Sequence, residues 1–378
     1  MKFSINKTTL MDALTITQCV NTTNNQNYTL SGIYVEANED FIEIAATDEV
    51  ISVKKDVPAY VEQKGAVVVS KKLFIDIIKK LDDVTIFIET RDSSEASAKE
   101  MVISCGTSSF LLKAISADTY PQFPEVQATT KLSIDFDIFC ELSGLVDYST
   151  AISESSGSVF QGVLLKTNNN TLNMVATDQF RIAIASKKIQ MQNITDIEVV
   201  IPGKFLKEIA ALPKEEKQLH LNLNDKQIMV TFGRAVLVNK LLEGRFPNYE
   251  KIRPKNFLVE AVVSKKELLS AMDKLSVLTS ATEEALKFNF NHLTQTLEVS
   301  INSKDSGTGL ASMACEIKGD TSAELNFFYK HLLGGTKAYP NESICFNISE
   351  NGKQGVFISE NEDDSILNFE YIFTKKNI

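Results

Sequence analysis

The chain has 378 residues, of which 43% are hydrophobic and 23% are charged, and its formal net charge is −10. This length exceeds what one ordinary core supports and suits two or three domains, and the composition is that of a globular protein without low-complexity segments. The net charge argues against a protein that coats DNA, because nucleic-acid binders present a basic surface to the phosphates. A few lysines gathered on one inner face remain compatible with an acidic outer surface.

The hydropathy and cysteine patterns predict a soluble, cytoplasmic protein. No apolar run approaches the roughly 20 residues that a helix needs to span a bilayer, and the first residues lack the apolar region of a signal peptide. The five cysteines are scattered singly, without a Cys-x-x-Cys pair. This spacing favours reduced core thiols over disulfides or a zinc site.

Two proline-rich connectors divide the chain into three expected units, with the ranges 1–126, 127–254 and 255–378. The stronger connector is Leu-Leu-Glu-Gly-Arg-Phe-Pro-Asn-Tyr-Glu-Lys-Ile-Arg-Pro at 241–254, and a weaker copy, with Tyr-Pro-Gln-Phe-Pro, lies at 115–126. Proline lacks a backbone N–H and fixes φ, so neither a helix nor a strand ladder continues through these segments. Each third should therefore fold as a unit of its own.

The first two units show the same predicted elements. The first has a helix at 8–20, a strand, turn and strand over 30–55, and a strand leading into a helix over 67–81; the second has them at 135–149, 160–188 and 199–212. In the helix of 67–81, Ser70 is the expected N-cap, and the apolar residues recur at helical spacing while Lys72 and Lys79 fall elsewhere. One face of this helix is therefore core and the other is basic.

The third unit repeats the pattern. A capping box from Ser264 to Glu267 predicts its first helix. Strands are expected at 287–290, 297–302, 343–348, 355–359 and 367–373, with a second helix at 326–338. Hairpin-linked strands with few helical crossovers predict an α+β fold in which each of three repeated units packs two helices on antiparallel sheets.

No catalytic constellation emerges from the titratable residues. Asp48 and Asp178 occupy matching Ala-Thr-Asp segments, and the third unit offers Asn302 instead, which indicates a turn residue rather than a catalytic base. The histidines are far apart and have no neighbouring cysteine, which gives a metal site little support; they are His220, His292 and His331. We therefore expect no enzyme activity, no metal and no cofactor, against the alternative of a hydrolase hidden in the repeats.

Two motifs carry a resemblance to a known family. Val-Ala-Thr-Asp-x-x-Arg-x-Ala at 175–183 and Gly-Arg-Phe-Pro-x-Tyr at 244–249, together with the opening Met-Lys-Phe, resemble the bacterial sliding clamp, the β subunit of DNA polymerase III. The resemblance implies three clamp domains that make half of a closed ring, with two chains joined head to tail around double-stranded DNA. Such a ring is a non-catalytic, nucleoid-associated processivity factor. Its partners would be the polymerase III alpha subunit, the clamp loader and other replication and repair proteins with clamp-binding peptides.

The same resemblance implies three sets of site residues. The partner-peptide pocket maps to Phe160, Thr177, Gln179, Phe180, Arg181, Ile182, Pro247, Lys251, Ile252, Ile372 and Thr374. The DNA-facing lysines map to Lys71, Lys72, Lys79, Lys204, Lys207, Lys265, Lys266 and Lys330, although a solvated helix face explains any one of them. The dimer interface maps to Phe110 and Leu112 on an edge strand and to Val277 and Leu278 on a helix; packing within the chain is the alternative.

The sequence departs from the family pattern at the expected pocket. Thr374 stands near the chain end where relatives have a methionine, and Gln179-Phe180 replaces the commoner Gly-His. A small polar residue and an added ring predict a shallower pocket with an altered peptide preference. These departures keep open a second reading, a specialised or self-protective clamp paralogue.

Overall fold

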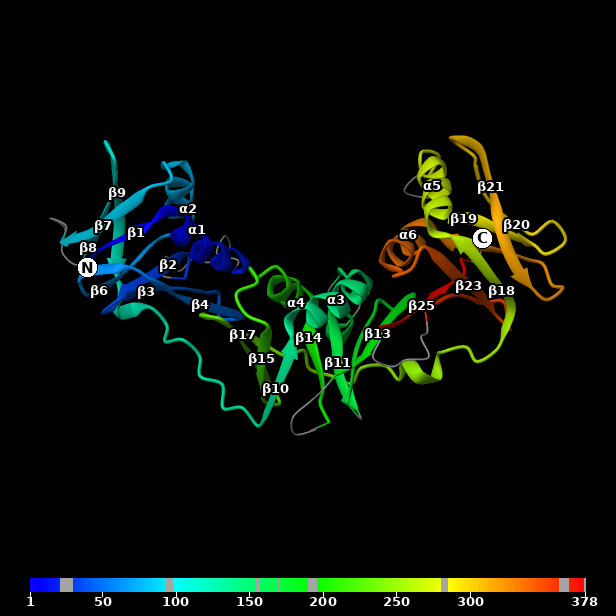
Figure 1. The fold of residues 1–378 in the computed structure, drawn as a ribbon, viewed down its shortest axis with the longest axis horizontal. Coiled ribbons are helices and arrows are strands. Elements are labelled where there is room, and N and C mark those ends of the chain that lie inside the picture. Colours follow the sequence, from blue (N-terminus) through cyan, green and yellow to red (C-terminus); the bar gives the residue numbers. More distant parts are fainter. Residues whose placement is uncertain are drawn as a thin grey trace. The chain divides into compact units, whose positions relative to one another are not determined.

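The computed structural model describes residues 1–20, 30–92, 98–153, 157–168, 170–189, 196–279, 285–359 and 367–376. They form two compact units, each built from two chain segments (Figure 1). The first unit contains residues 1–136 and 208–241, and the second contains residues 137–207 and 242–378. Both units are α+β, with helices packed on antiparallel strands. No helix within the described ranges is long and apolar enough to cross a membrane.

The described part of the first unit holds a sheet of thirteen strands in the order β10-β15-β16-β17-β4-β3-β2-β6-β9-β8-β7-β1-β5. These strands are β1 Lys2–Asn6, β2 Gly32–Ala37, β3 Phe41–Thr47, β4 Ile51–Pro58, β5 Tyr60–Gln63, β6 Gly65–Ser70, β7 Thr85–Asp92, β8 Ala98–Cys105, β9 Ser108–Ser116, β10 Thr130–Asp135, β15 Gln218–Leu223, β16 Gln227–Phe232 and β17 Ala235–Lys240. The helices of this unit are α1 Lys7–Ile16 and α2 Lys71–Lys80, with 3-10 turns at Thr17–Cys19 and Ala117–Thr119.

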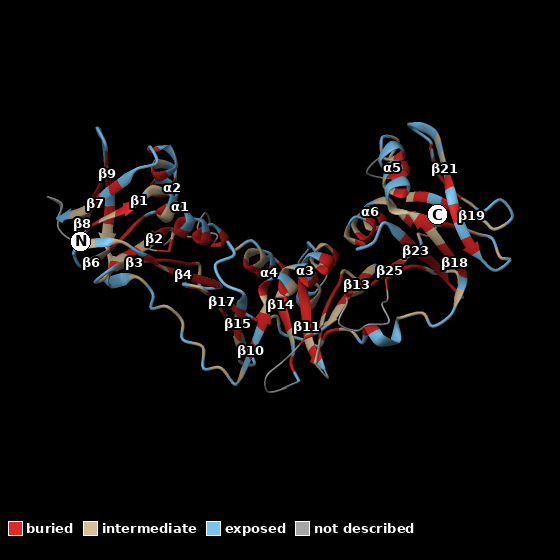
Figure 2. Cartoon of the chain, viewed as in Figure 1, coloured by how far each residue is buried: buried red, intermediate tan, exposed pale blue. Residues whose placement is uncertain are grey.

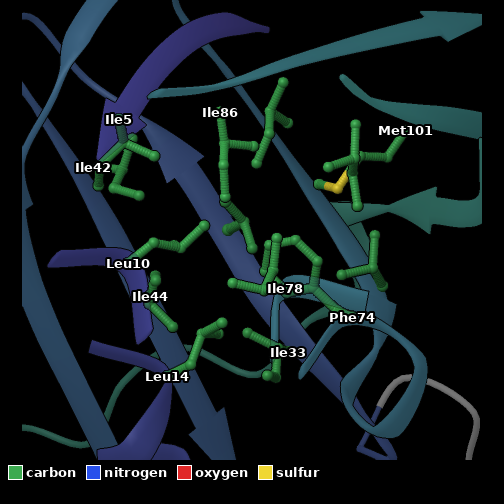
Figure 3. Close-up of a cluster of buried hydrophobic side chains, with 14 of the residues drawn as sticks. Ile5, Leu10, Leu14, Ile33, Ile42, Ile44, Phe74, Ile78, Ile86 and Met101 are labelled. Atoms are coloured by element: carbon green, nitrogen blue, oxygen red, sulfur yellow. The ribbon is translucent and has the colours of Figure 1, made fainter. Parts of the chain in front are cut away.

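The core of the first unit lies between α1, α2 and the sheet (Figure 3). Asn6 caps α1 by accepting a hydrogen bond from the Thr8 backbone N–H at 2.9 Å. Ser70 caps α2 in the same way, as the sequence predicts. Each helix then turns an apolar stripe to the sheet, and each strand contributes every second residue. The buried side chains that meet there include Leu10, Leu14, Ile33, Ile42, Ile44, Phe74, Ile78 and Ile86.

The described part of the second unit holds a sheet of twelve strands in the order β14-β11-β12-β13-β25-β24-β23-β18-β21-β20-β19-β22. These strands are β11 Gly162–Asn168, β12 Thr171–Thr177, β13 Arg181–Lys188, β14 Glu198–Pro202, β18 Phe257–Ser264, β19 Ala285–Asn291, β20 Thr296–Ser303, β21 Gly307–Lys318, β22 Ala323–Phe328, β23 Ser343–Ser349, β24 Gln354–Ser359 and β25 Asn368–Thr374. The remaining helices are α3 Phe136–Val146, α4 Gly203–Ala210, α5 Lys265–Ser276 and α6 Tyr329–Ala338, with 3-10 turns at Asp147–Ser149, Ser158–Gln161 and Tyr249–Lys251.

One order of elements occurs three times among the described residues: a strand, a helix, several strands, a second helix and three strands. The strands of the middle third are shared between the two sheets, because β17 pairs with β4 and β13 pairs with β25. In each unit the buried residues lie where the helices face the sheet (Figure 2). The three ranges expected from the connectors stay a prediction, since the two compact units divide the chain at other positions.

Two predictions for the third repeat are wrong, one on the start of a helix and one on the role of a single residue. The helix expected over 326–338 begins only at Tyr329, because the preceding residues form β22, in which Leu325 and Phe327 are buried in strand alternation. Asn302 does not replace the repeated aspartate, since it lies inside β20 opposite Thr308. A helical and a strand period cannot be separated over so short an apolar run.

Candidate functional site

A tight turn joins β12 to β13 and carries the first motif. The Thr177 hydroxyl oxygen accepts a hydrogen bond from the Gln179 N–H at 3.1 Å and donates one to the Arg181 carbonyl at 2.7 Å. Asp178 Oδ1 accepts from the N–H groups of Phe180 and Arg181, at 3.0 and 3.1 Å. Gln179 has a φ of 79°, in the left-handed region that favours glycine. Asp178 is therefore a turn residue, as the sequence predicts.

Arg181 leaves this turn towards a buried aromatic cluster. Its Nε lies 2.8 Å from Asp178 Oδ2, and its Nη2 donates to the backbone carbonyl of Tyr148 at 2.7 Å. The guanidinium carbon lies 5.7 Å from the centre of the Tyr148 ring. Burial raises the pKa of both the Tyr148 and Tyr371 phenols above the ordinary value of 10.0, so both rings stay neutral beside the cation. The arginine is thus fixed by its neighbours.

The end of β25 is tied to the same turn. The backbone N–H and the hydroxyl of Thr374 both donate to the Phe180 carbonyl, at 3.0 and 3.1 Å. The ring of Phe180 is 58% exposed, and its centre lies 6.3 Å from that of His331 on α6. Two of the three residues that depart from the family pattern, Thr374 and Phe180, therefore contact each other through the Phe180 backbone carbonyl.

The second motif forms a connector that covers this part of the sheet. Phe246 and Tyr249 are buried in a cluster with Leu164, Val175 and Ile182. Tyr249 opens the 3-10 turn Tyr249–Lys251. Burial, and next Glu250, raise the pKa of Tyr249 to about 12. The motif's aromatic residues are thus anchors that fix the connector to the sheet.

A cavity of about 230 Å³ opens between the turn, the connector and the ends of β24 and β25. Its floor is apolar, because Ile182 and Ile372 are buried there and the hydroxyl of the buried Thr177 is hydrogen-bonded within the turn. Its rim includes two exposed large side chains, Phe180 and Ile252. The residues that line it are Phe160, Thr177, Gln179, Phe180, Arg181, Ile182, Pro247, Tyr249, Ile252, Gln354, Ile372 and Thr374.

Every residue of the predicted pocket except Lys251 lines this cavity. Lys251 is exposed on the adjacent 3-10 turn. Tyr249 and Gln354 line the cavity without having been predicted. The tyrosine belongs to the second motif and could have been found there. Gln354 has no sequence signal, because only its pairing with Thr374 between β24 and β25 brings it to the cavity.

The predicted DNA-facing lysines differ in their surroundings. Lys71 and Lys265 are half-buried and donate to the carbonyls of Val20 and Tyr339, both at 2.5 Å. Lys207 is exposed and lies 3.6 Å from Asp147. The others are exposed on their helices; they are Lys72, Lys79, Lys204, Lys266 and Lys330. The two half-buried lysines thus already contact backbone of their own chain.

The residues predicted for a dimer interface also differ. Strand β9 is an edge over only part of its length, because residues 114–116 pair with β6 whereas residues 108–113 pair with β8 alone. Leu112 is 7% exposed and belongs to the core of the first unit, so the alternative of packing within the chain holds for it. Phe110 is 38% exposed and Val277 is 81% exposed, while Leu278 is half-buried.

The described ranges contain no group of three or more His, Cys, Asp or Glu side chains that could hold a metal ion. Tyr371 donates to the carbonyl of His331 at 2.8 Å and packs against Gly335 of α6. A Cβ at Gly335 would lie 2.2 Å from that ring. The helix therefore approaches β25 more closely than any side chain allows.

Two models of one protein family match the chain. Residues 1–124 match the N-terminal domain of the DNA polymerase III beta subunit, and residues 136–248 match its central domain. The beta sliding clamp of Bacillus subtilis is 25% identical over 377 residues, which cover 97% of each chain. That of Chlamydia muridarum is 26% identical over 356 residues, covering 94% of this chain and 95% of that protein.

Solved structures show the same fold. A DNA polymerase sliding clamp from Bacillus subtilis superimposes with a TM-score of 0.91 at 23% identity and covers 100% of this chain and 99% of that one. The DNA polymerase III subunit beta from Pseudomonas aeruginosa has a TM-score of 0.89 at 21% identity, with 100% of both chains covered. With both family models matched and relatives aligned along nearly the whole length, this chain belongs to the DNA polymerase III beta subunit family, the beta sliding clamps.

Proposed function

We propose that two copies of this sliding clamp close head to tail into a ring around duplex DNA, and that the cavity beside the β12–β13 turn tethers replication proteins to it. The cavity is the observation that supports the tethering role. It has the apolar floor, the few convergent polar groups and the open rim that a short peptide requires. Its partners would be the replicative polymerase, the clamp loader and repair proteins.

The lining determines which peptides the cavity would accept. The buried floor formed by Ile182 and Ile372 suits one or two apolar anchors, such as a Leu-Phe pair at the end of a short peptide. Arg181 lines the cavity and Lys251 is exposed beside it, so an acidic residue near the anchors gains a favourable charge interaction. Affinity should be concentrated in the anchors rather than in the rim.

The contact between Thr374 and Phe180 supports an altered peptide preference. A flexible methionine at position 374 would fill the cavity differently, whereas Thr374 directs its hydroxyl to the Phe180 carbonyl. The exposed Phe180 ring adds an apolar wall at the rim. This observation also favours the second candidate, a specialised clamp paralogue. Peptides from this organism's own polymerase should then bind more tightly than a general clamp-binding peptide.

The helices support the proposed contact with DNA. The exposed lysines lie on α2, α4, α5 and α6, and each helix turns its apolar stripe to its own sheet. Loose contacts of this kind give a weak, salt-dependent affinity, so the ring would be retained on DNA by topology. The three ranges 1–126, 127–254 and 255–378 would be the clamp domains. A protein of this kind would act in the cytoplasm, at the nucleoid.

The test is retention on DNA of different topology. Clamp loaded on a closed circle should survive high salt and leave when the circle is cut, and it should extend synthesis by a replicative polymerase on a primed circle. Loss at equal rates from linear and circular DNA would contradict encirclement. If the ring is retained but synthesis is not extended, the paralogue is the better assignment.

A further inference from the structure

The turn between β3 and β4 in the first unit is a copy of the turn beside the candidate site. Asp48 Oδ1 accepts from the N–H groups of Val50 and Ile51, at 3.0 and 2.8 Å. The Thr47 hydroxyl accepts from the N–H of Glu49 at 3.2 Å. Glu49 has a φ of 70°, in the same left-handed region as Gln179. The repeat therefore reproduces the three hydrogen bonds that the backbone N–H groups of the turn donate, together with its Ala-Thr-Asp sequence, whereas the Thr47 hydroxyl pairs with Ser52 instead of a backbone carbonyl.

A cavity lies beside this second turn too. It has a volume of about 170 Å³ and is bounded by Thr47 and Ser52, which flank the turn, and by the weaker connector, including Tyr120, Pro121 and Phe123. The ring of Tyr120 stacks on that of Tyr34, with their centres 5.1 Å apart. Turn and connector thus enclose a cavity in both repeats, each within its own compact unit.

The two cavities differ in chemistry because the strand residues beneath them differ. The registers of β2–β3–β4 and β11–β12–β13 align Ala45 with Val175, Ser52 with Ile182 and Lys54 with Ile184. In the second unit these positions form the apolar cluster under the connector. In the first unit they are smaller or polar. The first cavity is therefore more polar than its counterpart.

Carboxylates set the charge at one end of the first cavity. Glu43 lines it and is paired across the strands with Glu36 on β2 and Asp56 on β4. Lys54 lies 3.0 Å from Glu43, with its ammonium 5.1 Å from the centre of the Phe123 ring. Arg234 contacts Asp56 from the turn before β17, so three carboxylates meet two cations, one of them exposed. These five side chains therefore carry a net negative charge.

Asp56 is the carboxylate that this arrangement leaves least satisfied. Its Oδ1 is buried and makes no hydrogen bond to any described residue. Burial, and next the charge of Glu43, raise the pKa of Asp56 above its ordinary value. An additional cation near Glu43 and Asp56 would offset both effects. The connector residues Pro121, Phe123 and Pro124 also line the cavity and offer apolar contacts.

We propose that the cavity of the first unit is a second peptide site, which takes a lysine or arginine side chain flanked by apolar residues. The basic side chain would lie towards Glu43, which lines the cavity beside its cross-strand neighbour Asp56, and a flanking apolar residue would rest on Pro121 and Phe123 of the connector. The cavity of the second unit, which Arg181 lines, would instead favour an acidic side chain. Two repeat-related sites with opposite charge let one chain hold two different peptides. This inference requires only the geometry of the first unit, so it stands whether or not the second cavity binds peptides.

The test uses the full-length protein with methyl-labelled alanine, followed by NMR. The probes are N-acetyl-Gly-Leu-Lys-Leu-Gly-amide, its glutamate counterpart and N-acetyl-lysine-amide, each at millimolar concentration. The lysine peptide should shift the methyl signals of Ala45 and Ala46 and saturate, while the glutamate peptide leaves them unchanged. It should also bind more tightly than N-acetyl-lysine-amide, whereas equal binding of these two would indicate a site for free cations and overturn the peptide assignment.

Variants locate the site. Glu43→Gln should weaken binding of the lysine peptide about tenfold, as expected when a charge-assisted contact is lost. Ala45→Val, which installs the residue that the second repeat tolerates, should weaken it by reducing the cavity. The matched control is Glu39→Gln, which removes an equally charged but exposed residue of the same unit and should have no effect. Displacement of the lysine peptide by a saturating Leu-Phe peptide, or equal effects of Glu43→Gln and Glu39→Gln, would overturn the proposal. Unaltered Ala45 and Ala46 signals would do so as well.

Discussion

Arg181 and Asp178 form an ion pair, with the arginine Nε 2.8 Å from the carboxylate Oδ2, and each side chain is only 14% exposed. The other carboxylate oxygen accepts the two backbone hydrogen bonds of the turn. One carboxylate therefore fixes the turn and the arginine together. The geometry of the cavity wall depends on this single residue.

Asp178→Ala should loosen the turn and weaken peptide binding at the adjacent cavity. It removes both backbone hydrogen bonds and leaves Arg181 without its carboxylate, a loss of about 2 kcal/mol or more in local stability. Hydrogen exchange at the amides of Phe180 and Arg181 should accelerate accordingly. The control is Asp48→Ala in the repeated turn, which should accelerate exchange at Val50 and Ile51 but leave peptide affinity at the second-unit cavity unchanged. An unchanged exchange rate in Asp178→Ala would contradict the role of the carboxylate.

Ile252→Ala should lower the affinity for a Leu-Phe peptide about tenfold, because Ile252 is one of the apolar side chains that line the cavity and would pack against a peptide anchor. Leu258→Ala is the matched control, since Leu258 has the same 40% exposure in the same unit but lies outside the cavity lining. Titration calorimetry of the peptide with both variants distinguishes the loss of a contact in the cavity from the loss of exposed apolar surface elsewhere. If both variants bind as the wild type does, the peptide site lies elsewhere.

Gly335→Ala should destabilise the second unit by roughly 2 kcal/mol, because the added Cβ would overlap the buried Tyr371 ring. Gly144→Ala should instead stabilise it by about 0.5–1 kcal/mol, since this exposed glycine of α3 has open space around it and alanine is the better helix former. Thermal unfolding followed by circular dichroism compares the two. Equal shifts in melting temperature would show that α6 moves to accommodate the methyl group.

Val277→Asp should raise the dissociation constant of a dimer, because a charge would be placed in the proposed apolar contact. Leu293→Asp is the control: Leu293 is 82% exposed, against 81% for Val277, and belongs to the same unit but not to the predicted interface. Sedimentation equilibrium measures both constants. A monomeric wild type, or equal constants for the two variants, would show that the predicted interface is wrong.

Alkaline pH should destabilise the second unit partly through Tyr249. Its folded-state pKa of about 12 exceeds the ordinary value of 10.0, mainly through burial and then through Glu250. The unfolded state therefore loses its proton first, so the stabilisation is complete below pH 10 and is lost as the pH rises towards 12, at no more than about 1.4 kcal/mol per pH unit. Tyr249→Phe should flatten this part of the stability curve, measured by urea unfolding. An unchanged slope would contradict the assignment.

Much of the fold could be predicted from sequence because its signals are local. The caps at Ser70 and Ser264 and the strand alternation depend on neighbouring residues, and so does the turn at Asp178. Short apolar runs do not distinguish a helix from a strand: the sequence predicts the start of α6 three residues too early, because β22 occupies residues that also suit a helix. The recurrence of the elements in three parts of the chain is visible in the sequence alone.

The sequence by itself determined the repeats and the two connectors, because these depend on contiguous segments, and the family resemblance carried by the two motifs implied nearly all of the residues that line the cavity. Tertiary structure alone decided the contacts between distant segments. Strand pairing with β25 brought Gln354 to the cavity. Packing against the sheet and helices buried Leu112 in the core of the first unit, although its neighbours on β9 are exposed. Tertiary contacts also placed Lys71 and Lys265 within hydrogen-bonding distance of backbone carbonyls. The tertiary structure also produced a cavity beside the weaker connector, because a turn and a connector from remote positions meet over small side chains there. Contacts between distant segments depend on which strands pair, and strand pairing is determined by the whole sheet rather than by any one segment.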